Sequence, residues 1–357
     1  MPAAIGAILL VGIALYAIFG GADFGGGLWD LLAGGASRGW EPRRLIDESI
    51  TPVWESNHVW LVFDLVIFWT AFPRAFTSVM TAAAVPLWLA VAGIVLRGTG
   101  FAFRKEITDL RLLRVAGATF ALSSLVTPFF MGTVIGAIAT GSVAAHATRA
   151  NQSAWSNPTS LLIGFLFVAA CAYLAAVYLT SEAARRGDKR LRRYFARRAQ
   201  LASVVAGLLS LALLGELHGS NRLLYDRLTG RALPLVIIAA LCGVVTIALL
   251  SERTMRHLGA RSVAALGVGA VIWAWGVAQY PVLLPGTSVT LSTGGAPQST
   301  LDALFAVFVV AVVLVGPSFL LLYKLQSRRL LGTDESGLSS PSLPGDTTNR
   351  PAGPSTV

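Results

Sequence analysis

Five ionisable side chains lie in strongly apolar stretches of the sequence, where they could hold or transfer protons. They are Asp23 in GGADFGGG, Glu55, His58 and Asp64 in TPVWESNHVWLVFDL, and Arg97 in VLRGTG. An ionisable group within a membrane-spanning segment is costly and marks a functional site by default. Two carboxylates beside a guanidinium could form a proton entry point, and Asp23 with Arg97 could equally form a structural ion pair.

Helical spacing brings some of these side chains together and separates others. Glu55 and His58 are three residues apart and therefore share one face of a helix. Asp64 follows Glu55 by nine residues, which turns its side chain about half a turn away. We expect a proton- or quinone-related role for Glu55. Asp64 is an uncertain buried acid, for which a hydrogen bond to a neighbouring helix or a partner subunit is favoured.

The histidines argue against a haem held by two imidazoles of this chain. His58 is predicted to lie within a span. The other three histidines fall in predicted loops or at a span end: His146, His218 and His257. A pair of His58 with Met80 or Met131 is the remaining haem-ligand alternative, and a histidine packed at an interface is favoured over it.

Membrane-spanning helices must position these residues. Of the 357 residues, 55% are hydrophobic and 13% are charged, and the mean hydropathy is +0.68. Soluble domains carry about a quarter charged residues. Because lipid offers no hydrogen bonds to the backbone, each apolar stretch of about 20 residues predicts a helix. We predict an all-α polytopic membrane protein with nine spans: 3–23, 52–73, 78–101, 113–138, 159–183, 199–217, 232–251, 262–284 and 302–325.

Glycines and cysteines fall in or beside these spans. The glycines that surround Asp23 allow either close helix approach or a break in the helix: Gly20, Gly21, Gly25, Gly26 and Gly27. They lack the strand–turn–helix context of a phosphate-binding loop. Cys171 and Cys242 are interpreted as small core residues, so no disulfide framework is implied.

The distribution of Lys and Arg predicts how the chain sits in the membrane. Of the 28 Lys and Arg residues, all but six lie in loops after odd-numbered spans or in the C-terminal tail. Such an excess marks the cytoplasmic side. It predicts an N-terminus outside and a C-terminus in the cytoplasm. Residues 1–330 are expected to form the transmembrane domain, and residues 331–357, rich in Ser, Pro, Gly and Thr, a disordered cytoplasmic tail.

The densest basic segment is RRGDKRLRRYFARR, at residues 185–198 between the fifth and sixth predicted spans. We interpret it as a cytoplasmic retention signal that also contacts anionic lipid headgroups. Nucleic-acid binding is excluded as an interpretation, because no nucleic-acid-binding module accompanies the basic segment.

Two segments carry a family resemblance. GGADFGGGLWDLL and SITPVWESNHVWLVFDLVIFWTAFPRAF resemble subunit II of cytochrome bd-type quinol oxidases, in which a G-x-D-[FM]-G-x-G element precedes a helix with a W-[ED]-x-N-x-V-W-L core. Weaker matches are LRGTGFAFRK, NPTSLLIGFL and AQYPVLLPG, so the resemblance covers most of residues 1–325. The matching positions of the two main motifs are Asp23, Phe24, Gly25, Gly27, Trp54, Glu55, Asn57, Val59, Trp60, Leu61, Phe72 and Pro73.

The resemblance implies a two-subunit complex of the bacterial plasma (inner) membrane that oxidises quinol and reduces dioxygen to water in aerobic respiratory electron transport. The larger subunit I would carry haem b and haem d, and this chain would bind no haem of its own. This chain would have two four-helix bundles plus one helix, scaffold subunit I and hold a structural quinone.

The same resemblance assigns roles to individual residues. Glu55 would belong to a cytoplasmic proton path, with Asp23 and Arg97 as its neighbours. Trp54 and His58 are candidate quinone or interface contacts. Asp64 is not an acid of the family pattern.

Two other functions fit the sequence less well. A proton-coupled transporter working without a haem partner would typically place its site at the midplane between internal repeats. No repeat is evident, and the acids gather towards one face. A purely structural membrane partner, in which the proton route is lost, is the third alternative.

Overall fold

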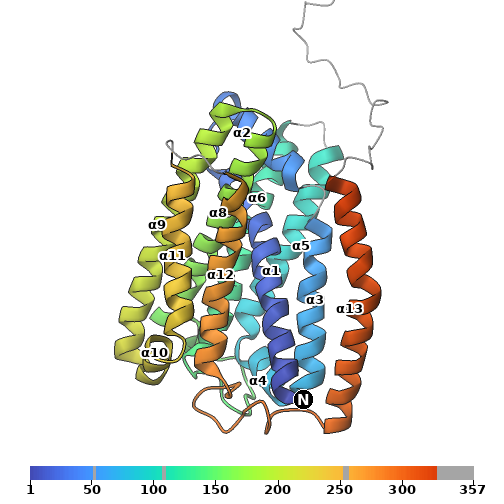
Figure 1. The fold of residues 1–357 in the computed structure, drawn as a ribbon, viewed down its shortest axis with the longest axis vertical. Helices are drawn as coiled ribbons and strands as arrows, with labels where there is room; N and C mark the ends of the chain where they lie inside the picture. The colour runs from blue at the N-terminus through green and yellow to red at the C-terminus, as the bar shows by residue number, and fades with distance from the viewer. Residues whose placement is uncertain (51–53, 107–109, 252–256, 328–357) are drawn as a thin grey trace, which may run out of the picture. The chain divides into compact units, whose positions relative to one another are not determined.

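The computed structural model describes residues 1–50, 54–106, 110–251 and 257–327, and the chain divides into two compact units, residues 1–304 and residues 305–357 (Figure 1). The predicted tail, 331–357, lies outside the described residues, so the division at residue 330 stays a prediction. The described residues form thirteen helices: α1 Pro2–Leu31, α2 Ala36–Ile50, α3 Trp54–Ala71, α4 Pro73–Ala82, α5 Ala84–Glu106, α6 Leu110–Ala139, α7 Gln152–Trp155, α8 Pro158–Arg185, α9 Lys189–Ser220, α10 Arg222–Thr229, α11 Leu233–Leu249, α12 His257–Gln279 and α13 Gln298–Ser327.

Each predicted span coincides with an apolar helix, which confirms the all-α membrane fold. Among the described residues, five helices are long and apolar enough to cross a membrane, and two bent pairs raise that number to seven. The pairs are α3 with α4, bent by 118°, and α10 with α11, bent by 72°. Two shorter apolar helices, Ala84–Gly100 and Gln298–Leu314, occupy the third and ninth predicted spans. The total of nine spans stays a prediction.

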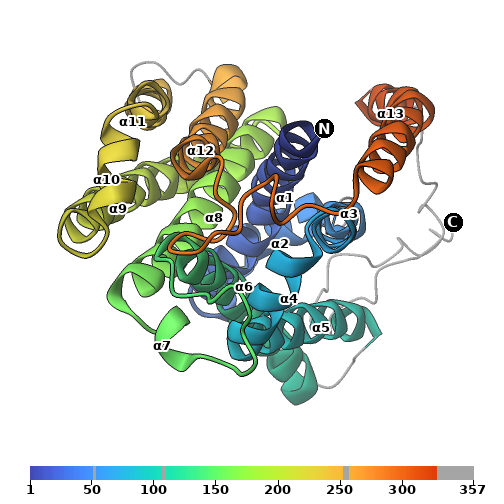
Figure 2. The same ribbon diagram turned by 90° about the horizontal axis from the view of Figure 1, so that it is seen from below.

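The helices of residues 1–304 pack as two groups, and α1 and α6 of the first group pack against α8 of the second. Helices α1, α3, α5 and α6 form one group, in which α5 packs on α6 and α1 packs on α3 and α6. Helices α8, α9, α11 and α12 form the other group. Helix α1 also packs against α8 and α12, and Figure 2 shows it between α3 and α8. The residues of the predicted site therefore lie on helices of one group.

Local signals set the ends of several helices. Proline occupies the first turn of α1, α4 and α8, where its missing N–H removes no hydrogen bond. The side chain of Asn157 accepts a hydrogen bond from the backbone N–H of Ser160 and caps α8. Asp188 caps α9 in the same way by accepting from Arg190 and Leu191.

The glycine-rich segment does not end or break the first helix. Helix α1 continues through Asp23 to Leu31, past the predicted end of the span at residue 23. Close helix approach explains these glycines: a Cβ added at Gly25 would lie 2.7 Å from the Cβ of Ala175 and still closer to the backbone carbonyl of Cys171. Asp23 therefore lies within a continuous helix, with two further turns between it and the helix end.

The basic segment predicted between two spans is mostly helical. Helix α8 ends at Arg185, and α9 begins at Lys189, so one chain reversal at residues 186–188 separates them. The amphipathic segment of α2 is also helical, and the sequence analysis did not predict it. Arg186 of the reversal pairs with Glu48 of α2, so α2 lies beside the junction of α8 and α9 (Figure 1).

Candidate functional site

Asp23 is held between α1 and α3. Its residue is 7% exposed, and its carboxylate accepts a hydrogen bond from the side-chain amide of Asn57 on α3. The same amide lies 3.4 Å from the backbone carbonyl oxygen of Phe19, one turn earlier on α1. A buried carboxylate with a donor at hydrogen-bond distance can be retained where a bare one would be strongly disfavoured.

Arg97 of α5 reaches the same place from the other side. Its guanidinium donates a hydrogen bond to the backbone carbonyl of Asp23 at 3.0 Å, and the residue is 3% exposed. The guanidinium carbon lies 4.8 Å from the ring centroid of Phe24 and 5.0 Å from that of Phe120. Stacking on aromatic faces favours a guanidinium over an ammonium. The structure thus brings Asp23 and Arg97 together. The hydrogen bond between them joins the Arg97 guanidinium to the backbone carbonyl of Asp23.

Arg97 also has unused hydrogen-bonding capacity. Its Nη1 atom is buried and has no hydrogen-bond partner among the described residues. The Arg97 guanidinium contacts the Asp23 carbonyl oxygen and the rings of Phe24 and Phe120. Its positive charge also acts on the Asp23 carboxylate. Such an arrangement can attract an anion or stabilise the ionised form of a neighbouring acid.

Glu55 and Trp54 lie in the first turn of α3, but their side chains are outside the described residues. The backbone places Glu55 two residues before Asn57. Its predicted place on a proton path, and the quinone or interface contact of Trp54, stay predictions.

His58 follows Asn57 on α3 and packs against aromatic rings of α1. Its ring centroid lies 6.2 Å from that of Tyr16 and 6.3 Å from that of Phe24. His218 packs instead on Tyr225 near the end of α9, with centroids 4.9 Å apart. Among the described residues, His, Cys, Asp and Glu do not gather in groups of three that could hold a metal ion. The expectation that this chain binds no haem of its own stays a prediction.

Asp64 forms a separate buried acid. It lies two turns beyond Asn57 on α3, so about 10 Å separates the two along the helix axis. A Cβ added at Gly12 of α1 would lie 2.9 Å from the Asp64 carboxyl carbon, so the missing side chain of Gly12 makes room for this acid. Its Oδ1 is buried without a hydrogen-bond partner among the described residues. The predicted hydrogen bond from Asp64 to a neighbouring helix is therefore not made by Oδ1 within the described residues. For Oδ2 it stays a prediction.

Tyr16 was missed by the sequence analysis. It is 6% exposed, and its ring packs against Phe24, with centroids 6.4 Å apart, and against His58. Its hydroxyl has no hydrogen-bond partner among the described residues. The signal that could have found it is spacing, because Tyr16 precedes Asp23 by seven residues and therefore shares its helix face.

The end of α1 beyond Asp23 is fastened to α2. Asp30 is 5% exposed, and its Oδ1 lies 3.0 Å from the Nε of Arg43. Arg43 also donates a hydrogen bond to the carbonyl of Gly34 at 2.6 Å. Arg43 of α2 therefore binds both the last turn of α1 and the loop that follows it. These contacts hold the C-terminal end of α1 in place.

A second ion-pair network joins α2 to the end of α8. Glu48 pairs with Arg44 at 2.8 Å and with Arg186, which also pairs with Glu182 at 3.3 Å. Partial burial raises the pKa of Glu48, but the hydrogen bonds from Arg44 and Arg186 outweigh it and hold the pKa below its usual value. The ends of α1, α2 and α8 therefore lie at one side of the molecule.

Comparisons with known proteins match this arrangement to one family. The family model described as cytochrome bd terminal oxidase subunit II matches residues 1–326. Cytochrome bd ubiquinol oxidase subunit 2 of Bacillus subtilis (strain 168) is 23% identical over 240 residues, which cover 66% of this chain and 67% of that protein. Cytochrome bd-I ubiquinol oxidase subunit 2 of Escherichia coli (strain K12) is 29% identical over 135 residues, which cover 37% of this chain and 35% of that protein.

A solved structure matches as well. A chain in the structure of bd oxidase from Geobacillus thermodenitrificans superposes with a TM-score of 0.71 and 26% sequence identity. The match covers 90% of this chain and 97% of that chain. The likeness therefore extends over most of the chain.

Proposed function

The chain belongs to the cytochrome bd terminal oxidase subunit II family, and on that basis we propose that it scaffolds a haem-bearing subunit I and supplies that complex with protons from the cytoplasm. The complex would oxidise quinol and reduce dioxygen to water. Haem b and haem d would supply the redox chemistry on subunit I. The residues of this chain would hold and transfer protons, and would bind a structural quinone near Trp54 and His58.

The observation that carries the proposal is the buried set of Asp23, Asn57 and Arg97. Three helices, α1, α3 and α5, each contribute one of these side chains. The Asp23 carboxylate is the group that would take up and release a proton. Asn57 would orient that carboxylate by its N–H donor, and Arg97 would favour its ionised form by its positive charge.

Glu55 is the proposed entrance to this path. It precedes Asn57 by two residues in the first turn of α3, nearer to the helix start than the Asp23 contact. A proton taken up by the Glu55 carboxylate would pass towards Asp23, directly or through water. Asp64 is left outside this path, because it lies two turns deeper on α3.

The proposed orientation has the N-terminus outside and the C-terminus in the cytoplasm. The excess of Lys and Arg supports it, and the ion pairs around Glu48 bring the ends of α2 and α8 to one side. Protons would then enter from the side on which α3 begins.

The two alternatives differ from this proposal in measurable ways. Family membership disfavours a transporter that works without a haem partner, because the relatives that this chain resembles are oxidase subunits. A subunit that only scaffolds subunit I would keep the complex intact but would carry no protons.

The first test is purification of this chain in a gentle detergent, followed by a visible absorption spectrum and a quinol-dependent oxygen-uptake assay. A haem-containing polytopic partner with oxidase activity is expected. A colourless protein without a partner, from an intact preparation, would contradict the oxidase assignment and would direct attention to transport assays.

The second test addresses the proton path in the purified complex in proteoliposomes. Glu55→Gln and Asp23→Asn are expected to slow oxygen uptake and proton uptake together, while the haem spectrum stays unchanged. Asp226→Asn removes an exposed carboxylate on α10 and serves as the control. Full turnover and proton uptake in both path variants would leave scaffolding as the sole role.

A further inference from the structure

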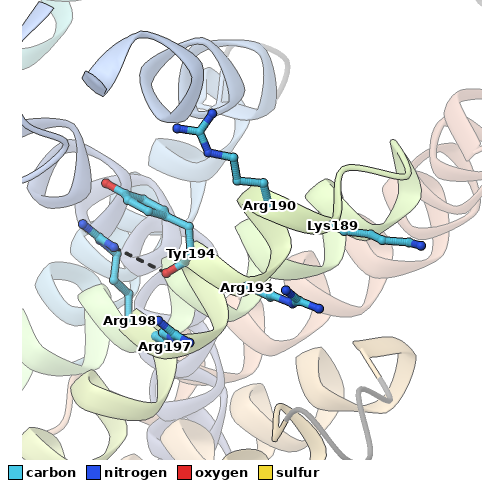
Figure 3. Close-up of a pocket in the computed structure, with 6 residues that line it drawn as sticks. All are labelled: Lys189, Arg190, Arg193, Tyr194, Arg197 and Arg198. Atoms are coloured by element: carbon cyan, nitrogen blue, oxygen red, sulfur yellow. Dashed lines mark hydrogen bonds between the residues drawn. The ribbon is translucent and has the colours of Figure 1, made fainter. Parts of the chain in front are cut away.

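The first three turns of α9 carry a strongly cationic cavity. It has a volume of about 580 Å³, and five of its six lining residues are cationic (Figure 3). The lining residues are Lys189, Arg190, Arg193, Tyr194, Arg197 and Arg198. An acidic side chain is absent from this lining. A cavity of this charge is suited to an anion.

The lining consists of two neighbouring rows on one helix. Residues 189, 193 and 197 form one row at four-residue spacing, and residues 190, 194 and 198 form the next. Figure 3 shows the side chains of Lys189 and Arg193 extending to one side of the helix and that of Arg190 extending to another. The rows therefore present positive charge over a broad arc rather than at a single point.

Tyr194 gives the cavity a defined inner wall. Arg198 lies over its ring, with the guanidinium carbon 3.4 Å from the ring centroid, and donates a hydrogen bond to its backbone carbonyl at 3.4 Å. The Tyr194 hydroxyl is buried and has no hydrogen-bond partner within the part of the chain that the structure describes. The Tyr194 ring and the Arg198 guanidinium therefore form one side of the cavity.

One of the five cations pairs with an acid of α2. Arg190 pairs with Glu41 of α2 at 3.1 Å, and both side chains are exposed.

The same helix face becomes apolar immediately beyond the cations. Leu201 follows Arg197 by one helical turn, and the exposed side chains continue along α9 in the same direction. These exposed residues are Leu201, Val204, Val205, Leu208 and Leu211, which we call the α9 apolar stripe. A cationic row that continues into an exposed apolar row matches the two parts of a lipid, a charged headgroup and its acyl chains.

Helix α11 extends this apolar surface. Gln200 donates a hydrogen bond to the carbonyl of Ile247 at 3.2 Å, and Ser203 donates to that of Gly243 at 3.3 Å. These bonds hold α11 beside the stripe, and its side chains Leu241 and Val244 are exposed there too. The adjacent helices α9 and α11 therefore both expose apolar side chains C-terminal to the cationic segment of α9 or beside it.

We propose that the cavity at the start of α9 binds the phosphate headgroup of an anionic phospholipid, whose acyl chains lie along the α9 apolar stripe. The continuity of the two surfaces favours a lipid over a free phosphate, which has no use for the stripe. The proposal does not rest on the proton path, because it uses residues of the other helix group.

The test uses the complete oxidase complex, stripped of lipid in detergent. Binding of phosphatidylglycerol and of phosphatidylcholine is followed by native mass spectrometry as each lipid is added. The cavity variant is Arg193→Gln with Arg197→Gln. The control variant, Arg74→Gln with Arg149→Gln, removes two exposed cations, one in α4 and one in the loop before α7. Arg193→Lys with Arg197→Lys retains the charge of the cavity.

Phosphatidylglycerol is expected to bind the wild-type complex more tightly than phosphatidylcholine does. The cavity variant should weaken phosphatidylglycerol binding about 30-fold, since each surface cation favours an anionic lipid by roughly fivefold. The lysine variant and the control variant should retain binding. Equal binding by the cavity variant and the wild type would overturn the proposal.

A second comparison distinguishes a lipid from a free phosphate. Glycerol phosphate carries the same charged group without acyl chains, and Leu201→Gln with Leu208→Gln makes the stripe polar. A lipid site predicts that the stripe variant weakens phosphatidylglycerol binding and that glycerol phosphate binds poorly. Tight binding of glycerol phosphate, unaffected by the stripe variant, would assign the cavity to a soluble phosphate and overturn the lipid proposal.

Discussion

The side-chain amide of Asn57 on α3 donates a hydrogen bond to the carboxylate of Asp23 on α1. This bond crosses between two membrane helices, and the Asp23 residue is only 7% exposed. Arg97 approaches the same residue from α5 and bonds its backbone carbonyl instead. The Asp23 carboxylate thus has a hydrogen-bond donor in Asn57 and a positive charge nearby in Arg97. This arrangement can hold a proton or release it.

Replacement of Asn57 by leucine should weaken both the fold and the proposed proton path. The substitution Asn57→Leu leaves the buried Asp23 carboxylate without its donor, which is expected to lower stability by about 1–3 kcal/mol. Thermal unfolding of the purified complex and quinol-dependent oxygen uptake measure the two effects. Ser203→Ala, which removes a hydrogen bond between α9 and α11, should lower stability slightly and leave oxygen uptake unchanged. Wild-type behaviour of Asn57→Leu in both assays would contradict this role.

Replacement of Arg97 should separate its charge from its shape. Arg97→Lys retains a positive charge but loses the flat guanidinium between Phe24 and Phe120, whereas Arg97→Met loses the charge as well. Loss of the bond to the Asp23 carbonyl should lower stability by about 1.5–3 kcal/mol in the methionine variant. Oxygen uptake should be intermediate in the lysine variant and lowest in the methionine variant. Equal activity in the two variants would show that the charge is dispensable.

Addition of one methyl group at Gly25 should destabilise the contact between α1 and α8. In Gly25→Ala the new Cβ would lie 2.7 Å from the Cβ of Ala175, so the helices must move apart, and such overpacking costs about 1–3 kcal/mol. Gly117→Ala is the matched control, because a Cβ there meets no heavy atom within 4 Å. The control should be as stable as the wild type or slightly more stable. A Gly25→Ala complex that unfolds at the wild-type temperature would contradict the close approach.

The Glu48 network should make stability depend on pH in acid. Hydrogen bonds from Arg44 and Arg186 outweigh the effect of partial burial and hold the pKa of Glu48 below its usual value of 4.5. The stabilisation is therefore fully present above about pH 4.5 and is lost as the pH falls through the lowered pKa. Because the pair is partly exposed, less than about 1 kcal/mol is expected.

Comparison of the wild type with Glu48→Gln measures this effect. The two unfolding temperatures should differ near neutral pH and should converge as the pH falls below 4.5. A difference that stays constant across this range would show that the Glu48 charge does not contribute.

Several features of the fold could be predicted from local sequence because their physical cause is local. A long apolar stretch must form a helix in lipid, since its backbone groups can bond only within the segment. Charged residues mark the ends of such stretches, which is why the predicted span positions agree with the observed helices. The motif around Asp23 and the α3 motif were sufficient to indicate the family, which the match over residues 1–326 confirms.

Other features depend on which helices meet, and a one-dimensional pattern does not contain this information. The glycines near Asp23 were compatible with a helix break or a close contact, and the packing of Gly25 against Cys171 and Ala175 decided for contact. The sequence alone allowed Asp23 and Arg97 to form either a proton entry point or a structural ion pair. Only the tertiary structure decided that Arg97 bonds the carbonyl of Asp23 while Asn57 bonds its carboxylate, because those partners lie on α5 and α3 and meet α1 only once the helices are packed.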